Sequence, residues 1–225
     1  SGGAEHQISE LSNILVKEGY QVQLVTFGDF PDHYRLDPNV VRLRLAENKS
    51  KISKFISIFT FFLTCKADCI FSYGQRESVF CIIPSIFRLR RNKIVACERS
   101  CTINRKADIY ENLLMKFLYK KVFAIVCNSY TQKEHILKLK PEYKNKLYTI
   151  INHINLNAFA PAPYPYNDII RICVFARYDK LKNYERLVEV VTAIKAKGYS
   201  LCLEWFGSCH MSNGSFYPDY LNLMD

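Results

Sequence analysis

The 225-residue chain carries 31 Lys and Arg against 21 Asp and Glu, a formal charge of +10, and 49% of its residues are hydrophobic. This apolar content excludes a disordered chain, and a composition with only 8 Gly excludes a collagen-like one. The longest apolar stretch, residues 55–65, is too short to cross a bilayer, and no signal-peptide pattern opens the chain. We therefore expect neither a transmembrane protein nor a conventionally secreted one.

Hydrophobic periodicity predicts that helices and strands alternate as far as residue 151. The expected helices are residues 4–18, 52–63, 77–87, 109–120 and 131–139. The expected strands are residues 22–27, 40–45, 69–72, 94–97, 123–127 and 147–151. Apolar strands that are followed by helices of this length form parallel βαβ units buried on both faces, so we expect an α/β fold.

The pattern changes after Asn152, because Pro161, Pro163 and Pro165 favour an extended connection between domains. Beyond this connection the sequence predicts one more βαβ unit. Its elements are a strand over 169–176, a helix over 183–197 and a strand over 200–206. We therefore expect an N-terminal domain over residues 1–157, and a linker with a C-terminal domain over 158–225. A single βαβ unit cannot close its own core, so the second domain is expected to be incomplete.

The nine cysteines are odd in number and include no C-x-x-C pair, which argues against both a disulfide framework and a zinc site. Cys127, Cys173 and Cys202 lie in apolar runs that we predict to be strands. Free cysteine behaves as a small buried hydrophobic residue. We therefore expect buried thiols, a reducing cytoplasmic compartment and no bound metal.

The positive charge belongs to the first domain. Residues 1–157 hold 24 basic and 14 acidic residues, whereas residues 158–225 hold 7 of each. The excess of basic residues concentrates between Arg42 and Lys121. It is most dense in two short groups, which are Lys49, Lys51 and Lys54, and Arg88, Arg90, Arg91 and Lys93. Such a distribution indicates an anionic partner, which the charge alone leaves open between membrane lipid, a phosphate-bearing substrate and nucleic acid.

Two short motifs are candidates for binding phosphate. Gly2 and Gly3 lie directly before a predicted helix, whose free N–H groups attract anions, although such a glycine pair is more often a flexible chain start. No strand precedes them, so either they are a tag-like remnant or a first strand is missing. Arg177, Lys182 and Asn183 follow an apolar strand, where the two cations can converge on one diphosphate. A solvated loop with a helix cap is the alternative explanation.

These segments together resemble glycosyltransferase family 4. Residues 2–5 and 15–22 resemble the "GG-A-E … L-x-x-x-G-H-x-V" opening of that family, and Arg177 with Lys182-Asn183 resembles its "G-R-L … K-N" motif. Residues 150–152 with Phe159 are similar to its "I-x-N-G-V-D … F" hinge, in which His153 replaces the glycine. Residues 96–100 resemble the "S-E-R-N" segment of members that build bacterial surface polysaccharides, and residues 127–129 resemble a family strand end.

The resemblance implies a GT-B fold, with one Rossmann-like domain and the start of a second, and a retaining transferase of the hexosyltransferase type. It implies that Arg177 and Lys182 act as catalytic cations on the departing diphosphate. The donor phosphates would contact Gly2, Gly3, Arg177, Lys182 and Asn183. Glu98 and Arg99 would contact the acceptor, although a surface ion pair explains those two residues about equally well.

The resemblance also implies a metal-independent reaction without cofactors, in which a nucleotide-sugar, expected to be a UDP-sugar, serves as co-substrate. The implied acceptor is a lipid-linked saccharide, handled in the cytoplasm by a protein attached peripherally to the membrane. The family's Glu-x7-Glu element would lie beyond residue 225, so residues 1–225 alone are expected to be inactive.

Three alternatives belong to other classes. A nicotinamide- or flavin-dependent oxidoreductase requires G-x-G-x-x-G after a strand, which the sequence lacks. A basic module that binds nucleic acid or another anion is less favoured, because basic and aromatic residues do not gather in one segment, and we expect no nucleic acid partner. A non-catalytic, glycosyltransferase-like fragment remains open. The helix over 52–63 is expected either to pack in the core or to lie on a membrane surface.

Overall fold

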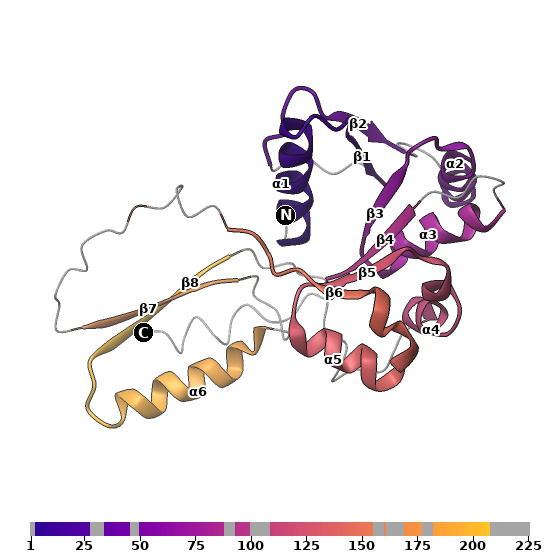
Figure 1. Ribbon diagram of the computed structural model, residues 1–225. Helices are drawn as coiled ribbons and strands as arrows, with labels where there is room; N and C mark the ends of the chain where they lie inside the picture. Colours follow the sequence, from indigo (N-terminus) through magenta and orange to yellow (C-terminus); the bar gives the residue numbers. More distant parts are fainter. Residues whose placement is uncertain are drawn as a thin grey trace. The chain divides into compact units, whose positions relative to one another are not determined.

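The computed structural model describes residues 3–27, 34–45, 50–87, 93–99, 109–154, 160, 169–176 and 182–207, with side chains omitted at 109–112. The chain divides into two compact units, residues 1–156 and 157–225, which are described separately below. Figure 1 shows both units with their helices and strands labelled.

Helices and strands alternate along unit 1. In chain order they are α1 (Gly3–Lys17), β1 (Gln23–Thr26), β2 (Val41–Arg44), α2 (Lys51–Thr64), β3 (Cys69–Tyr73), α3 (Gln75–Ile86), β4 (Lys93–Glu98), α4 (Ile109–Lys116), η1 (Leu118–Lys121), β5 (Ala124–Cys127), α5 (Tyr130–Leu139), η2 (Pro141–Lys146) and β6 (Leu147–Thr149). Strands β3, β4, β5 and β6 form a parallel sheet in that order, and β1 pairs with β2 in a second parallel sheet. The predicted α/β fold is confirmed.

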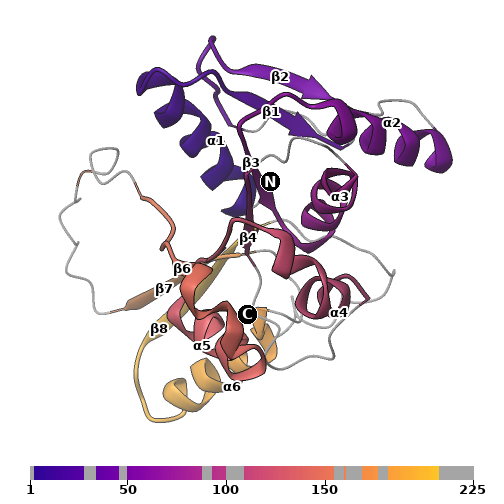
Figure 2. The same cartoon turned by 45° about the vertical axis from the view of Figure 1, so that its right-hand side comes forward.

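The central strands of unit 1 are apolar on both faces. Ile94, Ala96, Ile125 and Cys127 join one buried cluster with residues of α3, α4, η1, α5 and η2. The alternating residues Val95, Cys97, Ala124 and Val126 form a second cluster on the other face. Because side chains of a strand alternate between faces, β4 and β5 read as continuous apolar runs in the sequence. In both Figure 1 and Figure 2, α1 lies on the opposite side of the strands from α3.

The strand and helix limits differ from the predictions by a few residues, with one larger difference. The helix predicted over 109–120 ends at Lys116 and continues as the 3-10 turn η1. The Lys146 ammonium donates to the Tyr119 carbonyl and, at 3.5 Å, to the Val122 carbonyl, so it binds backbone acceptors at the end of η1. A contact with a lysine 27 residues away in the chain has no local sequence signal.

Unit 2 contains β7 (Ile170–Phe175), α6 (Tyr184–Lys195) and β8 (Leu201–Phe206), and its two strands are parallel. This is the βαβ unit that the sequence predicts. Its described residues bury only Tyr184, Val191 and Leu201, while Phe175 is 79% exposed. Phe175 stacks on Phe206 at 5.1 Å between ring centroids, so apolar surface remains open on this small sheet.

The cysteine prediction is only partly correct. Cys81, Cys97 and Cys127 are buried free thiols, as expected. Cys69, Cys173 and Cys202 are exposed, although each lies in an apolar strand. Cys173 and Cys202 are exposed because the two-stranded sheet of unit 2 leaves much of both strands uncovered. Strand periodicity therefore identifies the element but not how deeply it is buried.

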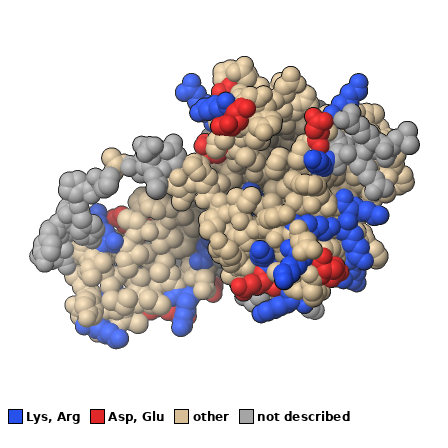
Figure 3. Space-filling view, viewed as in Figure 1, with Lys and Arg blue, Asp and Glu red and all other residues tan. Residues whose placement is uncertain are grey.

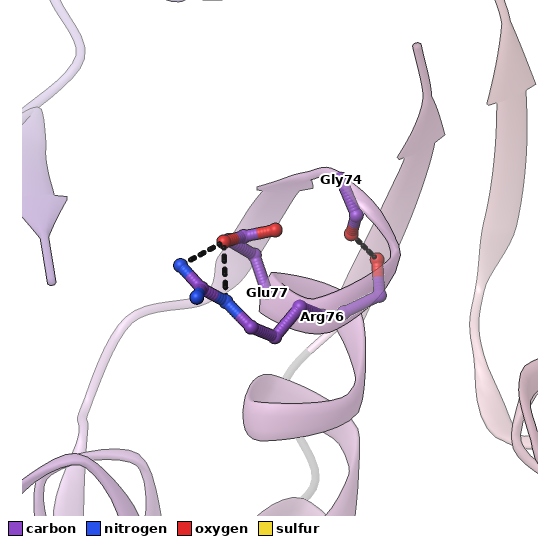
Figure 4. Close-up of polar contacts among 4 residues, drawn as sticks. Gly74, Arg76 and Glu77 are labelled. Carbon is purple, nitrogen blue, oxygen red and sulfur yellow. Dashed lines mark hydrogen bonds and ion pairs between the residues drawn. The ribbon is translucent and has the colours of Figure 1, made fainter. Parts of the chain in front are cut away.

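One glycine of unit 1 is required by its backbone conformation. Gly74 connects β3 to α3 at φ 121°, a value that side-chain-bearing residues rarely adopt. Its carbonyl accepts a hydrogen bond from the Ser78 hydroxyl at 2.7 Å, and a Cβ at this position would collide with the Glu77 carboxylate. Figure 4 shows the turn, with Arg76 paired to Glu77 at 3.1 Å.

Replacement of Gly74 is therefore expected to destabilise unit 1. Gly74→Ala should cost about 1–3 kcal/mol, or roughly 3–10 °C in thermal midpoint, because an alanine is strained at this positive φ, whereas the flexible Glu77 carboxylate can move aside. Gly3→Ala is the matched control, since nothing lies within 4 Å of a Cβ built there. Circular dichroism melting curves measure both changes. Equal midpoints for the two variants would contradict the required turn.

Candidate functional site

The carboxyl ends of the unit 1 strands bring several polar side chains to one edge of the sheet. All four strands β3 to β6 are parallel, so the chain leaves each of them at the same edge. Ligands of open α/β sheets bind outside this edge. The residues at these strand ends are Tyr73, Gly74, Glu98, Arg99, Asn128 and Asn152.

Arg99 is the centre of the polar contacts at this edge. Its guanidinium carbon lies 4.3 Å from the centroid of the Tyr73 ring, and its Nη1 donates to Asn152 Oδ1 at 2.9 Å. It thereby joins the end of β4 to the end of β3 and to the segment after β6. Arg99 Nε is buried and has no hydrogen-bond partner among the described residues. A buried donor left unpaired is costly, which marks it as available to a ligand or a water molecule.

Glu98 is the last residue of β4 and is almost completely buried, with 2% of its surface exposed. Its Oε2 accepts a hydrogen bond from Gln75 Nε2 at 3.2 Å. A carboxylate buried to this extent is rare unless it is paired or hydrogen-bonded. The surface ion pair that the sequence left open for Glu98 and Arg99 is wrong for Glu98, because that side chain is not on the surface.

Burial and the Glu98 charge determine the state of two neighbouring thiols. Burial raises the pKa of Cys97 to about 11, although the Arg99 charge opposes this shift. Burial also raises the pKa of Cys127 to about 12, and the Glu98 carboxylate adds to that rise. Burial raises the pKa of the Tyr73 phenol as well. All three groups are therefore protonated and neutral near pH 7.

The first helix reaches the same region through Gln7. Gln7 Nε2 donates to the His153 carbonyl, and the His153 N–H donates to Gln7 Oε1, both at 2.7 Å. Asn152, which binds Arg99, precedes His153 directly. Segment 152–153 therefore holds together the start of α1 and the end of β4. These contacts bring the predicted Gly3 region and Arg99 into one neighbourhood of unit 1.

The other residues predicted from the sequence are Gly2, Gly3, Arg177, Lys182 and Asn183. Gly2 and Arg177 are outside the described residues. Gly3 begins α1, and Lys182 is exposed just before α6 in unit 2. Asn183 adopts a left-handed conformation, φ 55°, at the N-cap of α6, and its side chain makes no capping hydrogen bond. Lys182 and Asn183 therefore lie at a helix start, where the phosphate motif and the alternative of a solvated loop with a helix cap both place them.

Sequence reasoning missed Tyr73, Gln75 and Gln7. The position of Tyr73 could have been predicted, because it is the last residue of an apolar strand whose carboxyl end lies at the edge of the sheet where ligands are expected. Gln75 and Gln7 gave none, because each acts through a partner 23 or more residues away. Ser129 has a structural role after β5, because its Oγ accepts a hydrogen bond from the Gln132 N–H at 3.2 Å and caps α5. Within the described part of the chain, no three His, Cys, Asp or Glu side chains are grouped as a metal site.

The thiols provide a direct test of this geometry. At pH 8 a pKa of about 11 leaves about one Cys97 in a thousand as thiolate, so both Cys97 and Cys127 should resist iodoacetamide. Exposed Cys173 and Cys202 should be alkylated first. Mass spectrometry of digested, partly labelled protein measures the order. Labelling of Cys97 as fast as that of Cys173 would contradict the buried strand end.

The family comparison agrees with the geometry of unit 1. No curated protein matches the chain at a significant level. The model of Glycosyltransferase Family 4 matches residues 1–158, a range that covers all of unit 1 with its sheet edge and the Asn152 segment. Since this match extends over well more than half of the 225 residues, the chain belongs to glycosyltransferase family 4.

Proposed function

We propose that the protein transfers a hexose, with retention of anomeric configuration, from a nucleotide-sugar to a hydroxyl of a saccharide acceptor. In this reaction the bond from the sugar C1 to the diphosphate oxygen breaks. A bond from C1 to the acceptor oxygen forms on the same face, and the acceptor hydroxyl loses its proton. The family match carries this proposal, and the polar edge of unit 1 supports it.

Arg177 and Lys182 are proposed to stabilise the departing diphosphate. Lys182 is exposed at the start of α6, whose N-terminal end carries partial positive charge. Arg177 lies between the end of β7 and that helix in the sequence. Two cations can balance the negative charge that develops on the leaving group, so the reaction is proposed to need no metal. Gly2, Gly3 and Asn183 are proposed as further donor contacts, with a UDP-sugar as donor.

The carboxyl edge of unit 1 is proposed to hold the acceptor. The buried Glu98 carboxylate and the Arg99 guanidinium offer an acceptor and donors of hydrogen bonds to sugar hydroxyls. A lipid-linked saccharide in surface polysaccharide synthesis, at the cytoplasmic face of the membrane, is the proposed acceptor class, on the likeness of residues 96–100 to members with that role.

The donor role is tested with Arg177→Ala and Lys182→Ala in the protein expressed from its full reading frame. Loss of either cation should lower kcat by about 100-fold, because preorganised charge acts mainly in the transition state. Arg186→Ala is the control, since Arg186 is exposed on α6 and pairs only with Glu189 at 2.9 Å among the described residues. Near-normal turnover in both test variants would remove these residues from the donor site.

The acceptor role predicts a different kinetic pattern. Glu98→Gln and Arg99→Lys should raise KM for the acceptor about tenfold while KM for the nucleotide-sugar stays within a factor of two. Arg76→Lys is the matched control, because Arg76 is an exposed arginine of unit 1 whose described ion pair is with Glu77. A rise in the donor KM instead of the acceptor KM would reverse the proposed assignment of the two substrates.

Residues 1–225 alone are proposed to transfer no sugar, because the described part of unit 2 buries three side chains and leaves apolar surface open. Calorimetry of this chain with a panel of nucleotide-sugars should detect only weak binding. Robust transfer by residues 1–225 would overturn that proposal.

A further inference from the structure

Helix α1 is tied to the rest of unit 1 by two side-chain amides. The residues that it buries, Ser9 and Ser12, are small and polar, and none of its apolar side chains is fully buried. No described helix, α1 included, is long and apolar enough to cross a membrane. Gln7 and Asn13 each form two hydrogen bonds with the backbone of a segment that lies far away in the sequence. These two amides therefore determine which segments the helix holds.

The Gln7 amide binds His153 through both of its polar atoms. Its Nε2 donates to the His153 carbonyl and its Oε1 accepts from the His153 N–H, each at 2.7 Å. Residues 150–154 are exposed, and among the described residues the stretch 151–154 forms hydrogen bonds only through Asn152 and His153. A carboxamide both donates and accepts, whereas an ionised carboxylate of the same shape only accepts. Gln7 therefore restrains an exposed stretch in a way that requires an amide.

The restraint reaches Arg99 through the residue that precedes His153. Asn152 Oδ1 accepts the hydrogen bond from Arg99 Nη1 at 2.9 Å, and the Tyr73 ring lies 4.3 Å from the same guanidinium. Formation of the Asn152 contact requires an ordered backbone, and ordering an exposed segment costs conformational entropy. Gln7 lowers that cost for Asn152, because it already orders His153. The orientation of the Arg99 guanidinium consequently depends on a side chain of α1.

The groups that hold Arg99 are neutral, so its charge remains available to a ligand. Gln7 and Asn152 are amides, and Tyr73 is protonated near pH 7 because burial raises the pKa of its phenol. Among the described residues Arg99 forms no ion pair with a carboxylate. Elsewhere on unit 1 the arrangement differs, since Figure 3 shows Lys and Arg side chains gathering over α4 and α5 with Asp and Glu side chains among them. A cation held by neutral groups keeps its full charge for hydrogen bonds to a polar ligand.

We propose that Gln7 is a positioning residue of the acceptor site, which orients the Arg99 guanidinium through segment 152–153. Gln7 touches no substrate in this proposal. Its loss should therefore affect the acceptor only through Arg99. The inference rests on the proposed function, because that function assigns Arg99 to the acceptor.

The first test measures Arg99 directly and needs no substrate. Gln7→Met keeps the length of the side chain but removes both hydrogen bonds, whereas Gln7→Glu keeps only the bond from the His153 N–H. Phenylglyoxal modifies guanidinium groups, and it should react with Arg99 about fivefold faster in Gln7→Met and about twofold faster in Gln7→Glu, because a released segment opens locally. Mass spectrometry of digested protein measures the rate, with the exposed Arg76 as internal reference.

Asn13 provides the matched control on the same helix. Its Nδ2 donates to the Arg35 carbonyl at 3.1 Å, and its Oδ1 accepts from the Asp37 N–H at 2.7 Å. The contact is of the same kind, but the described contacts of that segment do not lead to Arg99. Asn13→Leu should leave the rate of Arg99 modification within about 1.5-fold of the parent chain. Circular dichroism melting curves should show that Asn13→Leu and Gln7→Met are both folded.

The second test asks whether the positioning affects the acceptor. The protein expressed from its full reading frame is assayed with methyl β-glucoside as the acceptor probe. Gln7→Met should raise KM for the glucoside about threefold and leave kcat within about twofold. Added to Arg99→Lys, it should raise KM no further, because changes within one hydrogen-bond network are not additive.

Three outcomes would overturn the positioning role. They are an unchanged rate of Arg99 modification in Gln7→Met, an equal acceleration in Asn13→Leu, and additive effects of Gln7→Met and Arg99→Lys on KM. A different result would count against the proposed function alone. If Arg99→Lys leaves KM for the glucoside unchanged while Gln7→Met still accelerates modification, Gln7 positions Arg99 but Arg99 does not bind the acceptor. The two failures are therefore distinguishable.

Discussion

Parallel pairing of β3, β4, β5 and β6 is the constraint on which the rest of unit 1 depends. Parallel strands need a crossover after each strand, and that requirement puts α3, α4 and α5 in the connections and buries both faces of the central strands. It also makes every strand end at the same edge. Polar residues that lie far apart in the sequence consequently meet there, such as Arg99 with Tyr73, 26 positions earlier, and with Asn152, 53 positions later.

The elements of the fold could be predicted from the sequence because their signals are local. The apolar run that forms β4 and the spacing that forms α6 each specify an element within a dozen residues. The 3-10 turn η1 that follows the early end of α4 was not predictable from the local sequence. The Tyr119 carbonyl of this turn binds the ammonium of Lys146, which lies 27 residues further along the chain. Exposure of Cys173 was not predictable either, since it depends on how many strands flank β7.

The candidate site could be predicted only where it lies next to a strand. Glu98 and Arg99 follow an apolar run, and the family resemblance drew attention to the same residues. Their contacts could not be predicted from the sequence, because the Tyr73 ring comes from the end of β3 and the Gln75 amide from the start of α3. The burial of Glu98 is a property of the folded sheet edge, and no pattern in residues 96–100 distinguishes it from a surface carboxylate.

Arg99 and α2 show two kinds of group whose interactions the described part of the chain leaves unsatisfied. At the sheet edge the guanidinium is held by stacking and by one hydrogen bond, yet its buried Nε has no partner among the described residues. On α2 the backbone is equally regular, yet Ile52 and Ile56 remain in water. Both arrangements cost free energy in the isolated chain, the first through an unpaired donor and the second through hydrated apolar surface. The first cost falls when a small polar group binds, and the second only when an extended apolar surface covers the helix. The two surfaces of unit 1 therefore differ in the kind of interaction that each leaves unsatisfied.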